Sequence, residues 1–155
     1  MQRSGLTRDI NDGLEGNMQK KRLLKLADLL EADAKNKKGA RFGMGSWGYV
    51  NDPKKPVSCG TQACAMGLAA LSGAFKRAGL EAFIRSRGSI GFRLNGKRTS
   101  DGYHAAMKIF DLSPAEAQEL FTPTGSSFDE GAEGERAKAR QIRQFVKTGV
   151  LPESL

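Results

Sequence analysis

Residues 63–71 read Ala-Cys-Ala-Met-Gly-Leu-Ala-Ala-Leu, nine residues without a charged or strongly polar side chain. A helix that is apolar on every side has to be surrounded by other elements. We therefore predict that this stretch is a central buried helix. Thr61 is its expected N-cap, and Lys76, Arg77 and Gly79 mark its expected end.

Weaker signals on either side of this stretch complete the fold prediction. Ile90, Phe92 and Leu94 alternate with Gly91, Arg93 and Asn95, which is strand spacing, and Asn95-Gly96 is a turn signal. Residues 42–56 are rich in glycine and are expected to be irregular. The other predicted elements are a helix over 17–34, strands over 82–86, 90–94 and 97–100, short helices over 103–110 and 114–121, and a last helix over 129–147. The predicted fold class is α+β: a mostly helical single domain over 17–150 with a small antiparallel hairpin or meander, after a flexible leader over 1–16.

Composition excludes several classes of protein. No segment approaches the roughly 18–20 apolar residues that cross a bilayer, so we expect no membrane partner. The first sixteen residues lack the apolar core of a secretory signal, and two cysteines are too few for a disulfide scaffold. These features favour a cytoplasmic location. Cys59 and Cys64 with one histidine lack the paired spacing of a zinc module, so we expect neither a metal nor a cofactor.

The net charge of +8 is concentrated in the middle of the chain. Residues 35–98 carry thirteen basic side chains against two acidic ones, whereas the segments before and after are neutral and slightly acidic. Such a field favours an acidic partner, although a basic surface can also serve solubility alone. The densest part is the predicted hairpin, with Arg85, Arg87, Arg93, Lys97 and Arg98.

Strand spacing can place Arg85, Arg87 and Arg93 on the face opposite Ile90 and Phe92. Arginines on one sheet face suit recognition of phosphate or carboxylate groups, and alternatively they can keep a sheet edge solvated. We expect no aromatic side chain that could stack on bases to lie among them.

Two other features allow a functional and a structural interpretation. Trp47, the single tryptophan, can anchor the glycine-rich loop to the core or present a face to a ligand. Cys59 lies near a predicted helix start, where a thiolate is stabilised, and His104 could serve as its base. This pattern is that of a papain-like hydrolase or transferase. The alternative is that Cys59 and Cys64 are small buried hydrophobic residues.

The chain also resembles a known family over about residues 18–150. The segments that carry the resemblance are Leu23-Leu24-Lys25-Leu26-Ala27-Asp28, Phe42-Gly43-Met44-Gly45-Ser46-Trp47, Cys59-Gly60-Thr61 with Cys64 and Gly67, and Phe110-Asp111-Leu112-Ser113. They resemble uncharacterised proteins of phages, prophages and other bacterial mobile elements. The Cys-Gly-Thr-x-x-Cys segment is the most specific of the segments that carry this resemblance. The resemblance implies an accessory protein in the bacterial host cell that binds host or defence machinery.

These observations favour a small basic binding protein without enzymatic activity. Its expected partner is an acidic macromolecule, either nucleic acid or an acidic host complex such as a defence complex. The expected binding residues are Arg85, Arg87, Arg93, Lys97, Arg98 and Trp47. A cysteine-dependent enzyme using Cys59 and His104 is the alternative, and a homo-oligomeric structural module is a third.

Overall fold

The structure is a computed structural model that describes residues 13–36, 39–43, 47–54, 61–99, 101–121 and 131–150. Most of these residues are helical. The helices are α1 (Gly13–Lys35), α2 (Ala65–Leu71), α3 (Gly102–Phe110), α4 (Pro114–Phe121) and α5 (Gly131–Thr148), with a short 3-10 turn η1 (Lys76–Ala78). None of the helices described is both long and apolar enough to cross a membrane.

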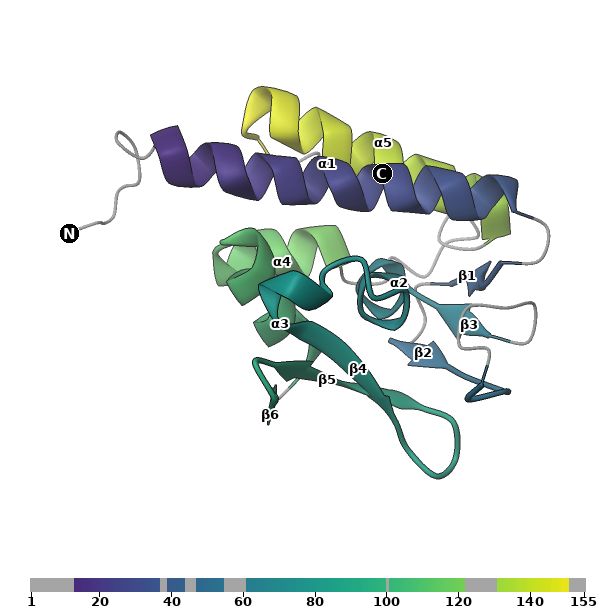
Figure 1. Ribbon diagram of the computed structural model, residues 1–155. Coiled ribbons are helices and arrows are strands. Elements are labelled where there is room, and N and C mark those ends of the chain that lie inside the picture. Colours follow the sequence, from purple (N-terminus) through teal and green to yellow (C-terminus); the bar gives the residue numbers. More distant parts are fainter. Residues whose placement is uncertain are drawn as a thin grey trace.

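Helix α2 is enclosed on all sides, as its apolar sequence predicts. Its residues 65–70 are all buried. Helices α1 and α5 lie side by side and form one layer, with α2, α3 and α4 beneath them (Figure 1). Strands β4, β5 and β6 (residues 80–98) lie beyond these helices, whereas β1 (residues 41–42) lies beside α2 and contacts α5. The α+β fold with a central buried helix is thus confirmed.

The predicted start of α2 is wrong by two residues. Residues 62 and 63 form a short strand, so the chain is still extended there and becomes helical only at Ala65. Cys64, rather than Thr61, is the N-cap: its Sγ accepts a hydrogen bond from the backbone N–H of Gly67 at 3.3 Å. The helix also ends earlier than predicted, at Leu71, and Gly79, at φ +100°, ends the separate turn η1.

Strands β4 (Leu80–Ile84), β5 (Ile90–Leu94) and β6 (Lys97–Arg98) form the predicted antiparallel meander. A second sheet was not predicted. It consists of β1 (Arg41–Phe42), β3 (Gln62–Ala63) and β2 (Gly48–Tyr49), in that order, and therefore occupies part of the segment expected to be irregular. Strands of two residues are too short for alternation to reveal them in a sequence. A bridge between Tyr49 and Ser89 joins the two sheets.

The remaining helices agree with the sequence, with small shifts at their ends. Helix α1 begins at Gly13, so the last four residues of the predicted leader are helical, while residues 1–12 lie outside the described chain. Helix α4 begins with the predicted Ser113 cap: the Ser113 hydroxyl accepts from the N–H of Glu116 at 3.1 Å, and the Glu116 carboxylate accepts from the N–H of Ser113. This reciprocal pair is a capping box.

Candidate functional site

The outer face of the β4–β5–β6 sheet gathers several of the predicted binding residues. On β5, Ile90 and Phe92 are buried against the core, so Gly91 and Arg93 point to the opposite face. Residues that pair directly across two strands share a face. Phe83 pairs with Gly91, and Arg98 pairs with Arg93. Arg85 follows Phe83 by two residues and continues the same face.

Three guanidinium groups surround the ring of Phe83. Their Cζ atoms lie 5.2 Å (Arg85), 4.8 Å (Arg93) and 4.5 Å (Arg98) from the ring centroid, which is within the range of cation–π contact. We call Phe83, Arg85, Arg93 and Arg98 the arginine face. The Phe83 ring lies against Gly91, where a Cβ atom would come within 2.7 Å of the ring carbon Cε1.

The arginine face carries an excess of positive charge. Three guanidiniums about 5 Å from one point lie within about 10 Å of one another, where like charges repel each other. Glu81 is the acidic residue of this face: it pairs with Arg93 across the two strands, and its ion pair is with Lys76 at 3.9 Å. Within the described chain, the side chains of Arg93 and Arg98 have no hydrogen bond or ion pair. Arg85 donates one of its guanidinium hydrogens to the carbonyl of Ile90 at 2.6 Å.

The other predicted binding residues lie elsewhere. Arg87 is exposed in the turn between β4 and β5, outside the arginine face. Lys97 pairs with Leu94, so its side chain starts from the opposite face of β6. Trp47 is half-buried and packs edge-on against Phe92 and Tyr103, with centroid distances of 5.7 Å and 4.9 Å. These are the contacts of a packing anchor.

An aromatic residue does lie among the arginines, because Phe83 is at their centre. The expectation that no aromatic side chain there could stack on bases overlooked Phe83. The signal was present in the sequence. Phe83 and Arg85 are two residues apart in a strand, and such residues share a face. The convergence of three arginines on one ring requires the strand register, which the sequence does not specify.

Cys64 is a structural residue. It is buried, and burial raises the pKa of its thiol to about 11, so the thiol is protonated at neutral pH. Sγ donates to the carbonyl of Trp47 at 3.4 Å and accepts from Gly67. The second cysteine, Cys59, lies outside the described residues, so its pairing with His104 stays a prediction. His104 is exposed in the first turn of α3, where its backbone N–H is capped by Asp101 at 2.9 Å.

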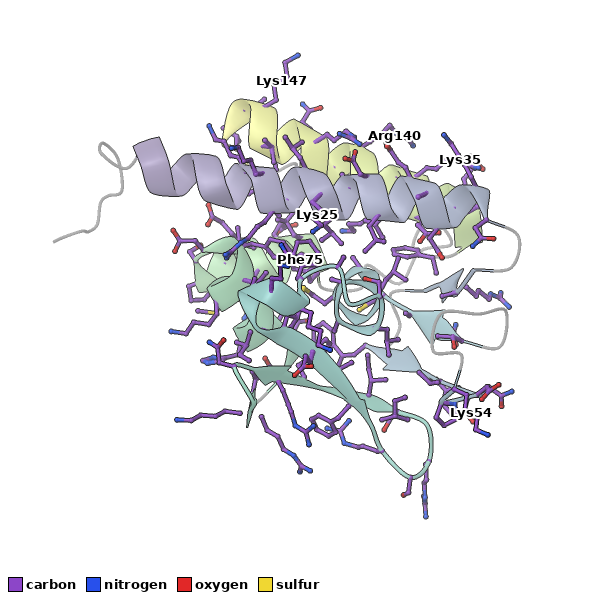
Figure 2. All side chains as sticks on the ribbon, in the orientation of Figure 1. Lys25, Lys35, Lys54, Phe75, Arg140 and Lys147 are labelled. Carbon is purple, nitrogen blue, oxygen red and sulfur yellow. The ribbon has the colours of Figure 1, made fainter. Side chains whose placement is uncertain are left out.

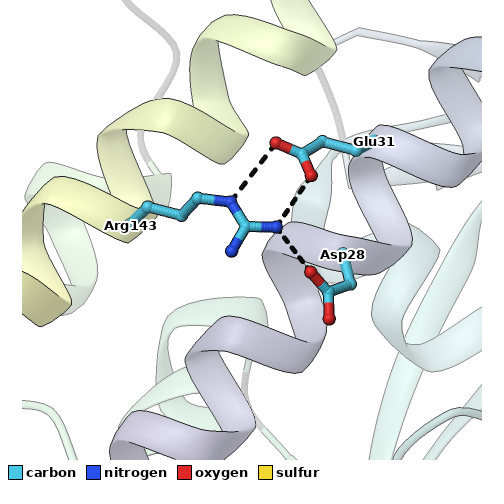
Figure 3. Close-up of polar contacts among 3 residues, drawn as sticks. All are labelled: Asp28, Glu31 and Arg143. Carbon is cyan, nitrogen blue, oxygen red and sulfur yellow. Dashed lines mark hydrogen bonds and ion pairs between the residues drawn. The ribbon is translucent and has the colours of Figure 1, made fainter.

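The opposite side of the molecule also carries cations. Lys35, Arg140 and Lys147 project from the α1–α5 layer (Figure 2). On the same layer, Arg143 is neutralised by Glu31, at 2.7 Å, and by Asp28 (Figure 3). The hydrogen bond with Glu31, followed by that with Asp28, raises the pKa of the Arg143 guanidinium, and the same contact with Arg143 lowers the pKa of Glu31. The arginine face lacks this compensation.

Neither a metal-binding group nor a similarity to a known protein assigns a function to the arginine face. No group of three His, Cys, Asp or Glu side chains that could hold a metal ion occurs in the ranges given above. No protein-family model matches the chain, and no curated protein or solved structure is significantly similar to it.

Proposed function

We propose that this protein binds nucleic acid through the phosphate backbone, using the arginine face, and carries out no chemical step. The observation that carries the proposal is the convergence of Arg85, Arg93 and Arg98 on one ring without a matching set of carboxylates. Such a cluster is electrostatically unfavourable until an anion reaches it. Binding a phosphate relieves the repulsion.

Arginine suits this role better than lysine would. Its guanidinium is planar, always charged and able to donate two parallel hydrogen bonds to a phosphate. Phe83 limits the positions that the three side chains adopt, which lowers the entropy lost when a ligand orders them. The grouping of three guanidiniums on the arginine face supports a polymer rather than a single phosphate, because a polyanion contacts several cations together. A host nucleoprotein complex, which the resemblance to mobile-element proteins favours, offers the same chemistry.

The test is a titration of fluorescently labelled 30-nucleotide DNA and RNA of random sequence over a salt series, followed by anisotropy. The logarithm of the affinity should fall linearly with the logarithm of the salt concentration. The variant R85A/R93A/R98A should lower the magnitude of this slope by about 2–3, because each lost phosphate contact removes about 0.7–0.9.

A matched control removes three positive charges from the opposite layer. The variant K35A/R140A/K147A has the same net charge as the arginine variant, so it should keep the wild-type slope if the arginine face is the site. Circular dichroism would confirm that both variants are folded. The proposal is refuted if the two triple variants weaken binding equally. It is also refuted if polyglutamate binds and nucleic acid does not, because the partner would then be an acidic protein.

A further inference from the structure

The arginine face continues across the second sheet through a row of exposed residues. The backbone N–H of Arg85 donates to the carbonyl of Ser89, Ser89 bridges to Tyr49, and Tyr49 pairs with Gln62 on β3, which pairs with Arg41 on β1. Residues paired in this way share a face. All five members of the row are exposed, whereas their neighbours Phe42, Gly48, Ala63 and Ile90 are buried.

Tyr49 is the aromatic member of this row and is 46% exposed. Its ring lies against Gly88, where a Cβ atom would come within 2.5 Å of the ring carbon Cε1. Gly88 has φ +94°, and its carbonyl accepts a hydrogen bond from the N–H of Val50 at 2.8 Å. The turn and the strand therefore hold the ring in place while nearly half of the side chain faces solvent. Among the residues described, Tyr49 and Val150 are the exposed large hydrophobic side chains.

Tyr49 and Phe83 are separated by two strand spacings and one step of two residues along the strand, or about 12 Å between Cα atoms. Arg85 lies between them, since it is next to Ser89 in the row and two residues from Phe83. The face therefore presents an exposed aromatic ring beside the arginine cluster, of which Arg85 is a member. A ring next to several cations suits a strand in which an unpaired base adjoins its phosphates.

We propose that this face binds single-stranded nucleic acid, with a base stacked on Tyr49 and the adjoining phosphates held by the arginine face. The inference rests on the proposed function and adds its substrate class. A base in a duplex is already stacked on both sides, so only an unpaired base offers a ring face to Tyr49. Because every base has a ring face, the binding tolerates many sequences.

The experiment compares one 30-nucleotide sequence as a single strand and as a blunt duplex, at physiological salt, with full-length protein. The wild type should bind the single strand at least about 5-fold more tightly than the duplex, the effect of one stacked base. Tyr49→Leu keeps an apolar side chain but removes the ring, and should weaken single-strand binding about 5-fold or more with duplex binding and the salt slope unchanged. Tyr49→Phe should bind as the wild type does. Val150→Ala, at the other exposed apolar side chain, is the matched control.

The outcomes separate this inference from the proposed function. Equal affinity for the two forms, with Tyr49→Leu equal to the wild type, overturns the inference and leaves backbone binding intact. A preference for single strands that Tyr49→Leu does not reduce overturns the role of Tyr49. If neither form binds at low salt, both proposals are wrong. Urea unfolding of each variant tests whether a variant with weaker binding is still folded.

Discussion

Replacing Glu135 by glutamine removes a carboxyl group that the fold buries beside a second one. Glu135 is 2% exposed and Asp33 is 9% exposed, and the two meet where α5 packs against α1. One oxygen of Asp33 accepts a hydrogen bond from the backbone N–H of Ala40 at 3.1 Å. Burial, followed by the hydrogen bond and the charge of Asp33, raises the pKa of Glu135 to about 10. Glu135 is therefore protonated at neutral pH and donates to Asp33.

The sign of the effect on stability follows from this pKa. In the unfolded chain the pKa of Glu135 returns to its ordinary value of 4.5, so the proton is kept in the folded state and lost in the unfolded state between pH 4.5 and 10. The contribution of Glu135 to the free energy of unfolding is complete below pH 4.5 and is lost as the pH rises toward 10. Across this window the free energy of unfolding falls by about 1.4 kcal/mol per pH unit. From pH 6 to pH 8 the loss is about 3 kcal/mol, a large part of a stability of roughly 5–15 kcal/mol.

The variant Glu135→Gln should remove this dependence. The glutamine amide has the same shape, is neutral at every pH and can donate the same hydrogen bond to Asp33. Urea unfolding of the two proteins near pH 6, 7 and 8 gives the difference in stability, which should move in favour of the variant by about 1.4 kcal/mol per pH unit. Comparing the two proteins cancels the titration of groups that do not interact with Glu135.

Glu133→Gln is the matched control. Glu133 is exposed in the first turn of α5, so its carboxylate is in water in both states and the substitution should leave the pH dependence of stability unchanged. If the wild type and Glu135→Gln give parallel stability curves between pH 6 and 8, Glu135 is charged in the folded protein and the reasoning about the buried pair is wrong.

Three further substitutions test other parts of the structure. Gly91→Ala should lower the free energy of unfolding by about 1–3 kcal/mol, because the added methyl group displaces the Phe83 ring. It should also weaken nucleic-acid binding although all the arginines are present. Urea unfolding measures the first effect and fluorescence anisotropy the second. In a Cys59→Ser background, Cys64 should react with iodoacetamide at least about 100-fold more slowly in the native protein than in urea, because its pKa of about 11 leaves little thiolate; equal rates would contradict its burial. Arg143→Ala should lower the free energy of unfolding by at most about 1 kcal/mol, because the ion pairs of Arg143 with Asp28 and Glu31 are exposed. This loss of stability should become smaller as salt is added. A loss that does not depend on salt would point to lost packing.

The sequence predicts those parts of the fold that local pattern determines. The apolar run over 63–71 identifies the buried helix, and the alternation of Ile90, Phe92 and Leu94 identifies the central strand of the meander. The β1–β3–β2 sheet is not predictable in this way. Its strands are two residues long. One of its two pairings joins residues 21 apart in the sequence, and the other joins residues 13 to 15 apart.

The candidate site likewise contains residues that the sequence identifies and residues whose position depends on strand pairing. Charge density identifies Arg85, Arg87, Arg93, Lys97 and Arg98 as one group, because acidic residues are nearly absent from this segment. It does not separate the three arginines that share a face from Arg87 and Lys97, which lie elsewhere. The position of Phe83 among them depends on its pairing with Gly91, which is a property of the hairpin register. Tyr49 enters the face only through its bridge to Ser89, a contact between two sheets of which one was not predicted.

The short segment from Trp47 to Tyr49 links the buried N-terminal end of α2 to the exposed face that carries Tyr49. The carbonyl of Trp47 accepts from the backbone N–H of Cys64 at 3.3 Å and from its thiol, and it lies against Gly67 with no room for a Cβ atom. Two residues further along, Tyr49 is presented on the outer face. Cys64 and Gly67 therefore determine where β2 runs. We expect that substitutions at these two buried positions change nucleic-acid binding through the position of Tyr49, although neither residue lies on the arginine face or in its exposed row.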